Sequence, residues 1–174
     1  MRQTARELTT EEIRSAEIQR LIADMRDTMY DAPGVGLAGP QVGLSLQLAV
    51  IEDKQEYTRD LTTEQLADRE RNAVPFHVII NPTITETSGT KEFYEGCLSL
   101  AGFMAVVPRA ERVRVECLDE NAQTKVIEAS GWYARILQHE IDHLNGNLYI
   151  DRMNSSTFTS LDNWNRFVKS KTAR

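Results

Sequence analysis

Apolar residues repeat at helical spacing near the N-terminus of the chain. Between residues 9 and 31 they lie three and four positions apart, which predicts an amphipathic helix with one apolar stripe: Ile18, Leu21, Ile22, Met25 and Met29. Thr9 and Glu12 can form a capping box at its start, and the turn-forming run 31–34 ends it. A stripe of this kind is typical of core packing rather than of a cofactor site.

The middle of the chain has the pattern of short strands. The segments with this pattern are residues 47–51, 77–80, 83–86, 91–94, 104–107, 112–118 and 124–129, with a hairpin turn at 119–121 between the last two. Residues 52–73 are polar and highly charged, with a short helix predicted at 63–71. We expect this segment to be an exposed insertion that carries no chemistry.

A second strong helix follows the strands. Residues 132–144 are mostly good helix formers, without an internal glycine or proline. A short strand at 148–150 and a helix from residue 160 come next, the helix with Leu161, Trp164 and Phe167 on one face. We therefore expect an α+β fold: mostly antiparallel strands around a central helix, with an N-terminal helix and a short C-terminal helix.

Composition narrows the class of protein. A length of 174 residues predicts one domain, 1–174, with a real hydrophobic core. The 26 acidic against 20 basic residues give a net charge of −6, which argues against a DNA-binding surface. No apolar run approaches the length of a membrane span, and the first residues lack the apolar segment of a secretory signal. We expect no membrane partner and a cytoplasmic location.

Candidate chemistry is concentrated in the helix at 132–144. His139 and His143 stand four residues apart, so both side chains lie on one helix face and can hold a metal ion, while Glu140 can reach a water on that ion. A chance match on a surface helix is the alternative. An open catalytic site needs a third ligand, and no histidine or nearby glutamate follows downstream. The candidate is upstream, Cys97 in the segment EGCLS, and its thiolate requires a reducing compartment.

A third segment with chemical character is GVGLAGPQVG at residues 34–43. The ordered set GVGLAGPQ, EGCLS and QHEIDH resembles peptide deformylase, over about residues 2–158. The resemblance implies a metal-dependent hydrolase that removes the formyl group from N-formylmethionyl nascent peptides and releases formate. Stretches around the motifs look most similar to the organelle-type branch, although EGCLS with Leu98 is also the usual bacterial form. A mitochondrion or plastid, as a mature form lacking its transit peptide, is therefore the alternative location.

The resemblance also implies the metal chemistry. Cys97, His139 and His143 are expected to bind one divalent metal ion. Ligand softness alone suggests zinc, whereas the resemblance implies Fe(II), with nickel or cobalt as active substitutes and zinc as a poor one. Glu140 is the implied base, which takes a proton from the attacking water and later delivers it to the leaving amine.

Other residues of the motifs are expected to stabilise the reacting group. The side-chain amide of Gln41 and the backbone N–H of Leu98 are the implied donors to the oxyanion. Family members most often have alanine where this chain has Gly39, which predicts a looser loop around Gln41, although Pro40 restrains it. Gly34 and Gly36 are expected to let a substrate backbone approach closely and to offer an edge for β-type pairing.

A pocket for the methionine side chain is expected beside the ligands. Trp132 and Ile136 share the helix face of the two histidines, so with Val35 they are candidates for its apolar wall. Ordinary core packing is the alternative for both. For His77 and Cys117 we expect structural roles in strands, rather than a ligand and a disulfide partner.

Two rival functions and one partner are left open. A zinc metallopeptidase also fits the two histidines and the glutamate, but not EGCLS, and a non-catalytic metal domain that binds N-terminal peptides is the second rival. The tail is basic, because only Asp162 opposes its four basic residues, Arg166, Lys169, Lys171 and Arg174. These charges predict either a weak, salt-sensitive contact with the ribosome or a helix face turned to water.

Overall fold

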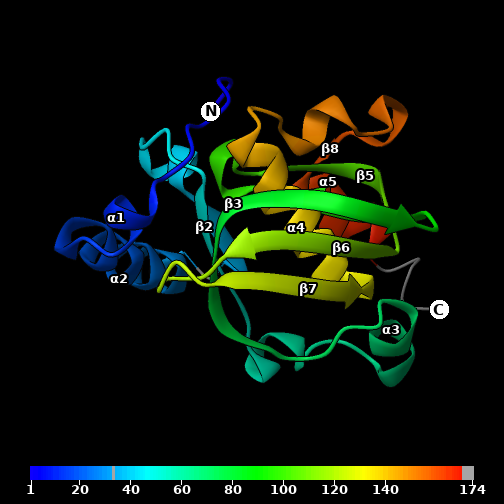
Figure 1. Ribbon diagram of the computed structural model, residues 1–174. Coiled ribbons are helices and arrows are strands. Elements are labelled where there is room, and N and C mark those ends of the chain that lie inside the picture. Colours follow the sequence, from blue (N-terminus) through cyan, green and yellow to red (C-terminus); the bar gives the residue numbers. More distant parts are fainter. Residues whose placement is uncertain (33, 170–174) are drawn as a thin grey trace.

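The computed structural model describes residues 1–32 and 34–169 (Figure 1). Its larger sheet has the order β1 (Gly36–Ala38), β2 (Leu48–Asp53), β3 (Val74–Ser88), β6 (Arg112–Leu118), β7 (Thr124–Ser130). The smaller sheet has the order β4 (Lys91–Gly96), β5 (Phe103–Arg109), β8 (Thr159–Ser160). Every paired strand runs antiparallel to its neighbour, which confirms the expected α+β class.

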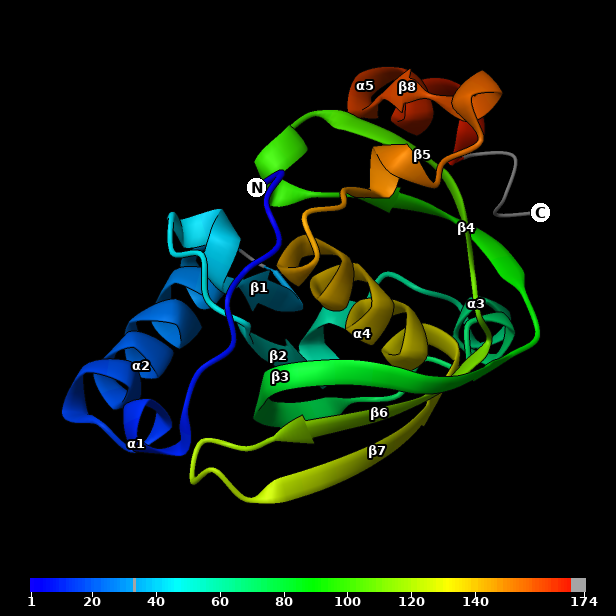
Figure 2. The same ribbon diagram turned by 45° about the horizontal axis from the view of Figure 1, so that its top comes forward.

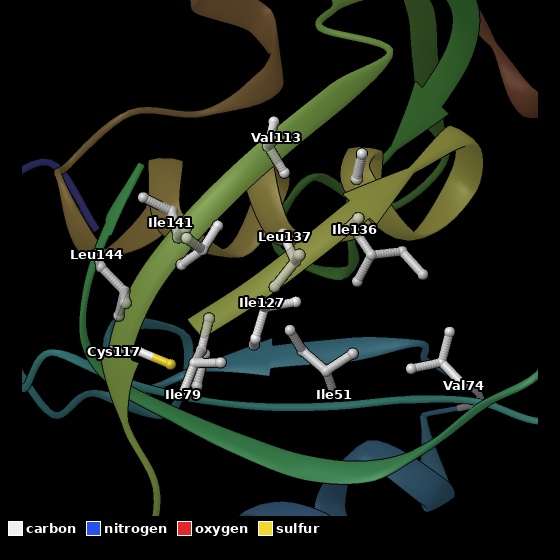
Figure 3. Packing of buried hydrophobic residues seen from close by; sticks show 14 of the residues in the cluster. Ile51, Val74, Ile79, Val113, Cys117, Ile127, Ile136, Leu137, Ile141 and Leu144 are labelled. Atoms are coloured by element: carbon white, nitrogen blue, oxygen red, sulfur yellow. The ribbon is translucent and has the colours of Figure 1, made fainter. Parts of the chain in front are cut away.

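The central helix α4 (Gly131–Leu144) packs on one face of the larger sheet and lies between the two sheets (Figure 2). Alternate strand residues such as Ile51 and Ile79 meet Leu137 and Ile141 of this helix (Figure 3). The residues between them, such as Val50, point to the opposite face. The period of two along each strand therefore gives the larger sheet two buried faces.

The N-terminal helix covers that opposite face, but it differs from the expected single helix. Thr9 and Glu12 do form a capping box, which begins the short helix α1 (Thr10–Ile13). The chain then breaks at Ser15, whose hydroxyl oxygen accepts from the N–H of Ile18 and begins α2 (Ala16–Asp31). The predicted stripe lies on α2, where all five positions except the partly buried Leu21 are buried.

Two other segments differ from the sequence patterns. The segments 77–80 and 83–86 belong to one strand, β3, which continues through two register shifts. Residues 148–150 were expected to be a strand, but Tyr149–Asp151 form a 3-10 turn. The carboxylate of Asp151 accepts from the N–H of Leu148 at 2.7 Å, which closes the chain into this turn.

The insertion and the tail contain short helices. Helix α3 (Thr63–Asp68) lies in the insertion as expected, and α5 (Leu161–Asn163) begins the tail and continues as a π-helical turn, Trp164–Val168. The expected apolar face of the tail is not buried as a unit, because Leu161 and Phe167 are exposed. Within residues 1–32 and 34–169, no helix has the length and apolar character needed to span a membrane.

Candidate active site

Three side chains with metal-binding donors meet between α4 and the turn that follows β4. His139 and His143 stand one turn apart on α4, and Cys97 precedes the 3-10 turn Leu98–Leu100. Their donor atoms all lie within 4.8 Å of one another. The two histidine Nε2 atoms are 3.1 Å apart, and Sγ of Cys97 is 3.3 Å from Nε2 of His143. One thiolate and two imidazoles form a donor set that suits a divalent transition metal.

The surroundings of Cys97 favour the thiolate, which is the form that binds metals. Burial raises the pKa of this thiol, but hydrogen bonds with His139 and His143 outweigh burial and lower the pKa to about 5. Burial lowers the pKa of His139, but hydrogen bonds with Cys97 and Glu95 outweigh it and raise the pKa to about 10. The two neighbouring imidazoles thus favour the anionic form of the sulfur.

Glu140 lies next to these donors and is almost completely buried, with 3% of its surface exposed. Burial raises the pKa of its carboxyl group. Its Oε2 atom has no hydrogen-bond partner among the described residues. A Cβ atom at Gly36 would come within 2.3 Å of Oε1 of Glu140. The missing side chain of Gly36 therefore makes room for Glu140. The expected close approach of a substrate backbone to Gly36 stays a prediction.

The amide of Gln41 faces the same group of atoms. Its Oε1 accepts from the N–H of Ala38 at 2.8 Å, so its NH₂ group points toward Sγ of Cys97, 3.7 Å away, and toward the hydroxyl of Ser99. A Cβ atom at Gly39 would meet two backbone carbonyl oxygens at 3.0 Å. A side chain at position 39 would therefore crowd these two oxygens, and the looser loop expected around Gln41 stays a prediction.

Behind the ligands lies a cluster of buried ion pairs that the sequence patterns did not identify. Glu95 accepts from Nδ1 of His139 at 3.1 Å and twice from the guanidinium of Arg109 at 3.0 Å. Arg135 also donates to Glu95, and Arg109 donates to Asp142. Burial raises the pKa of Glu95, but the bonds from His139 and Arg109 outweigh it and hold the pKa well below its usual range. A carboxylate on Nδ1 turns the Nε2 side of an imidazole toward a metal.

A cavity of about 460 Å³ opens beside this cluster. The predicted site residues that line it are Gly34, Val35, Gly36, Gln41, Cys97, Leu98, Trp132, Ile136, His139 and Glu140. His143, the remaining predicted ligand, is fully buried. Ile136 both lines the cavity and belongs to the core between α4 and the larger sheet. Its contact with a methionine side chain stays a prediction.

The charged insertion contacts one wall of this cavity, although we expected it to carry no chemistry. The N–H of Trp132 donates to the carbonyl oxygen of Arg69 at 2.8 Å. The guanidinium groups of Arg69 and Arg71 lie 5.0 and 5.1 Å from the Trp132 ring. Arg71 is fixed in turn by two 2.8 Å hydrogen bonds to the buried carboxylate of Asp53. The insertion therefore supports Trp132 from outside.

The other two singled-out residues have structural contacts. Nδ1 of His77 donates to the carbonyl oxygen of Pro75, and Nε2 accepts from the hydroxyl of Tyr133 at 2.9 Å. Cys117 is a free, buried cysteine of β6. Burial raises the pKa of its thiol to about 11. Both predictions of a structural role are confirmed.

Comparisons with known proteins agree with the geometry. The family model described as polypeptide deformylase matches residues 1–159. The chain is 46% identical over 164 residues to peptide deformylase 1A, chloroplastic/mitochondrial, of Arabidopsis thaliana, and the match covers 94% of this chain and 61% of that protein. It is 42% identical over 146 residues to the mitochondrial peptide deformylase of Homo sapiens, covering 83% of this chain and 60% of that protein.

Solved structures have the same fold. The peptide deformylase of Thermus thermophilus is 39% identical with a TM-score of 0.72, covering 99% of this chain and 87% of that one. A peptide deformylase of Legionella pneumophila is 42% identical with a TM-score of 0.71, covering 88% and 79%. The chain thus spans about three fifths of the length of these two curated relatives and most of these two solved structures. By its match over residues 1–159, the chain belongs to the polypeptide deformylase family.

Proposed function

We propose that this protein hydrolyses the N-terminal formamide of formyl-methionyl nascent peptides and releases formate. One observation carries the proposal: the donors of Cys97, His139 and His143 meet a buried carboxylate and a fixed amide at one cavity. With a metal ion held by the three donors, such a site would combine a Lewis acid, a base and an oxyanion donor, which are the groups that amide hydrolysis requires. The family membership supports the same chemistry.

The three ligands are proposed to hold one divalent ion, Fe(II) in the native protein. When bound, such an ion acts as a Lewis acid that polarises the formyl oxygen and lowers the pKa of water. A soft thiolate beside a redox-active ion is sensitive to oxidants. The iron-loaded protein should therefore lose activity in air, whereas the nickel-loaded protein should keep it. Air-stable activity of the iron-loaded protein, equal to that of the nickel-loaded protein, would count against Fe(II).

Glu140 is the proposed general base. Its Oε2 atom, unpartnered within the described part of the chain, can accept a proton from the attacking water. Burial raises the pKa of this carboxyl group, which moves it toward neutral pH and makes it a better base. The same oxygen can then pass the proton to the amine that leaves as formate forms.

Two donors are proposed to stabilise the oxyanion. The NH₂ group of Gln41 is held in one orientation, because its Oε1 atom already accepts from Ala38. A donor that is fixed in advance needs little reorganisation as charge develops on the substrate oxygen. The backbone N–H of Leu98, next to the ligand Cys97, is the second donor proposed.

The sheets offer a place for the peptide itself. Among the described strands, β1 and β4 each pair on one side alone, so each presents a free edge. The cavity is lined both by Gly34–Gly36, at the start of β1, and by Tyr94–Gly96 of β4. An extended peptide can therefore pair with these edges. Val35, Trp132 and Ile136 then provide the apolar wall for the methionine side chain.

Formate release separates this function from its rivals. The iron- or nickel-loaded protein should release formate from formyl-Met-Ala and leave unblocked Met-Ala-Ser intact. Cleavage of the unblocked peptide bonds would favour a metallopeptidase, and binding without turnover would favour a non-catalytic peptide-binding domain. Acetyl-Met-Ala is the matched control, because it offers the same peptide with a larger acyl group.

The basic tail supports a weaker proposal of ribosome docking. Arg166 and Lys169 lie in the described segment, whereas Lys171 and Arg174 lie outside the described residues. Replacing all four by glutamine should reduce co-sedimentation with ribosomes at low salt and leave hydrolysis of a short formyl peptide unchanged. Unaltered co-sedimentation would reject the docking role. The compartment proposed is one in which translation starts with formyl-methionine: the bacterial cytoplasm, a mitochondrion or a plastid.

A further inference from the structure

The mouth of the cavity is apolar and half exposed, unlike its inner end. Leu98, Phe103 and Leu161 all line the cavity, and 45–47% of each residue's surface is exposed. The charged residues among the described lining are Glu95, Arg135 and Glu140, and all three are buried. Three large apolar side chains gathered at an opening are typical of a binding surface.

Leu161 reaches this mouth from the tail of the chain. Strand β8 pairs with β5, with Ser160 opposite Phe103. Helix α5, which begins at Leu161, therefore starts close to β5 (Figure 2). The N–H of Leu161 donates to the carbonyl oxygen of Gly102 at 2.8 Å. Backbone pairing therefore fixes the position of Leu161, while its side chain is free to face the cavity.

A second contact holds the same tail segment in place. The Trp164 ring packs edge-on against Tyr94 of β4, with ring centroids 6.0 Å apart. The family match ends at residue 159, just before Leu161. The tail thus adds to the cavity a wall that lies outside the matched region.

The path of the substrate determines what meets this wall. In the proposed function the formyl group lies at the buried ligands and the methionine side chain fills the inner apolar wall. An extended peptide advances about 3.3 Å per residue, and its successive side chains point to opposite sides. The residue after methionine therefore lies nearer the mouth, with its side chain directed away from the inner pocket.

We propose that Leu161, together with Phe103, contacts the side chain of the residue that follows formyl-methionine and selects apolar residues there. This inference rests on the proposed deformylase function. An apolar side chain would cover exposed surface of Leu161 and Phe103, which is favourable in proportion to the area removed from water. An acidic side chain would lose hydration there without a cationic partner among the described lining residues at the mouth.

The test compares selectivity within each enzyme. The ratio of kcat/KM for formyl-Met-Leu-Ser over formyl-Met-Asp-Ser should be about tenfold in the native protein and should fall about fivefold in Leu161→Ala. Leu161→Met should restore most of the ratio, which separates loss of the contact from a folding defect. Phe167→Ala is the matched control, because Phe167 is an exposed apolar residue of the same segment that does not line the cavity. An unchanged ratio in Leu161→Ala would overturn the proposal.

A binding measurement keeps this inference separate from the proposed function. In a Glu140→Ala background, calorimetry should show tighter binding of formyl-Met-Leu-Ser than of formyl-Met-Asp-Ser, and a further Leu161→Ala substitution should reduce that difference. If the protein releases no formate from any formyl peptide, the deformylase function is rejected, but the difference in peptide binding still tests the role of Leu161. An equal difference between the two peptides with and without the Leu161→Ala substitution would reject the role of Leu161, even if formate release is robust.

Discussion

The two ends of the cavity are built from different interactions. At the inner end, buried charges contact one another in a continuous network from His139 through Glu95 and Arg109 to Asp142. At the mouth, apolar side chains such as Leu161 are half exposed and are positioned by backbone pairing. Removing one member of a buried network leaves its partners unpaired, whereas trimming an exposed apolar side chain removes only its own contacts. Substitutions at the inner end should therefore change metal binding, stability and turnover, and those at the mouth should change selectivity.

The largest effect is expected at the inner end from Glu140→Ala. General bases typically contribute 10²–10⁴-fold to rate, so formate release should fall by about 10³-fold. Metal content, measured by elemental analysis, should be retained, because Glu140 lies beside the three ligands and not among them. Loss of the metal together with activity would move Glu140 into the coordination shell and contradict the proposed mechanism.

Glu95→Gln should be the next most damaging change. It leaves two buried guanidinium groups with a neutral partner and weakens the bond to Nδ1 of His139. We expect a stability loss of about 3 kcal/mol in urea unfolding and metal binding weaker by roughly 10–100-fold. Glu128→Gln is the control, because Glu128 pairs with Arg114 while 78% exposed and should contribute little. Equal losses of stability and metal affinity in Glu95→Gln and Glu128→Gln would show that the buried network supports neither.

Arg69→Ala tests the outer support of Trp132, between the two ends. Loss of the stacked guanidinium should cost about 1 kcal/mol of stability. In a Trp164→Phe background, the remaining Trp132 should show red-shifted fluorescence as water reaches its ring. KM for formyl-Met-Ala should rise a few-fold with kcat nearly constant. Glu64→Ala, an exposed change in the same insertion, should alter none of these values.

The smallest effect is expected for His77. Its hydrogen bonds join it to Pro75 and Tyr133, and not to the residues at either end of the cavity. Burial lowers the pKa of this imidazole. The unfolded chain, with an ordinary pKa near 6.5, therefore binds more protons than the folded one as pH falls, and stability decreases. His77→Gln should lose less stability than the native protein between pH 7.5 and pH 5.5, by at most about 1 kcal/mol. Identical pH profiles of urea unfolding would show that His77 is not responsible.

Sequence reasoning identified the residues whose relation is local. The i, i+4 spacing of His139 and His143 fixes their relative position as soon as the segment is helical, and α4 has this geometry. Cys97 was identified through the family resemblance of its motif. No local rule links it to its contact His143, which lies 46 positions later in the chain. Alternating residues likewise predicted the strands, but not the sheet to which each strand belongs.

The missed features depend on contacts between distant elements. Arg109 lies on β5 and Asp142 on α4, so their pairing with Glu95 of β4 requires the packed structure. The break at Ser15 had a readable signal, a serine that can cap a helix, within an otherwise continuous apolar stripe. The place of Leu161 had none, because its helical spacing with Trp164 suggested one apolar face instead of a cavity wall.

The origin of the ligands in two separate units of structure has a mechanical consequence. Cys97 follows a strand of the smaller sheet, whose own buried apolar cluster is small, consisting of Ala105, Val107 and Tyr149. His139 and His143 belong to the helix that is fixed to the larger sheet. An ion held by Cys97, His139 and His143 would therefore cross-link the two sheets, and it would bind the folded chain in preference to the unfolded one. We therefore expect local opening of the smaller sheet, rather than global unfolding, to set how readily a bound ion leaves.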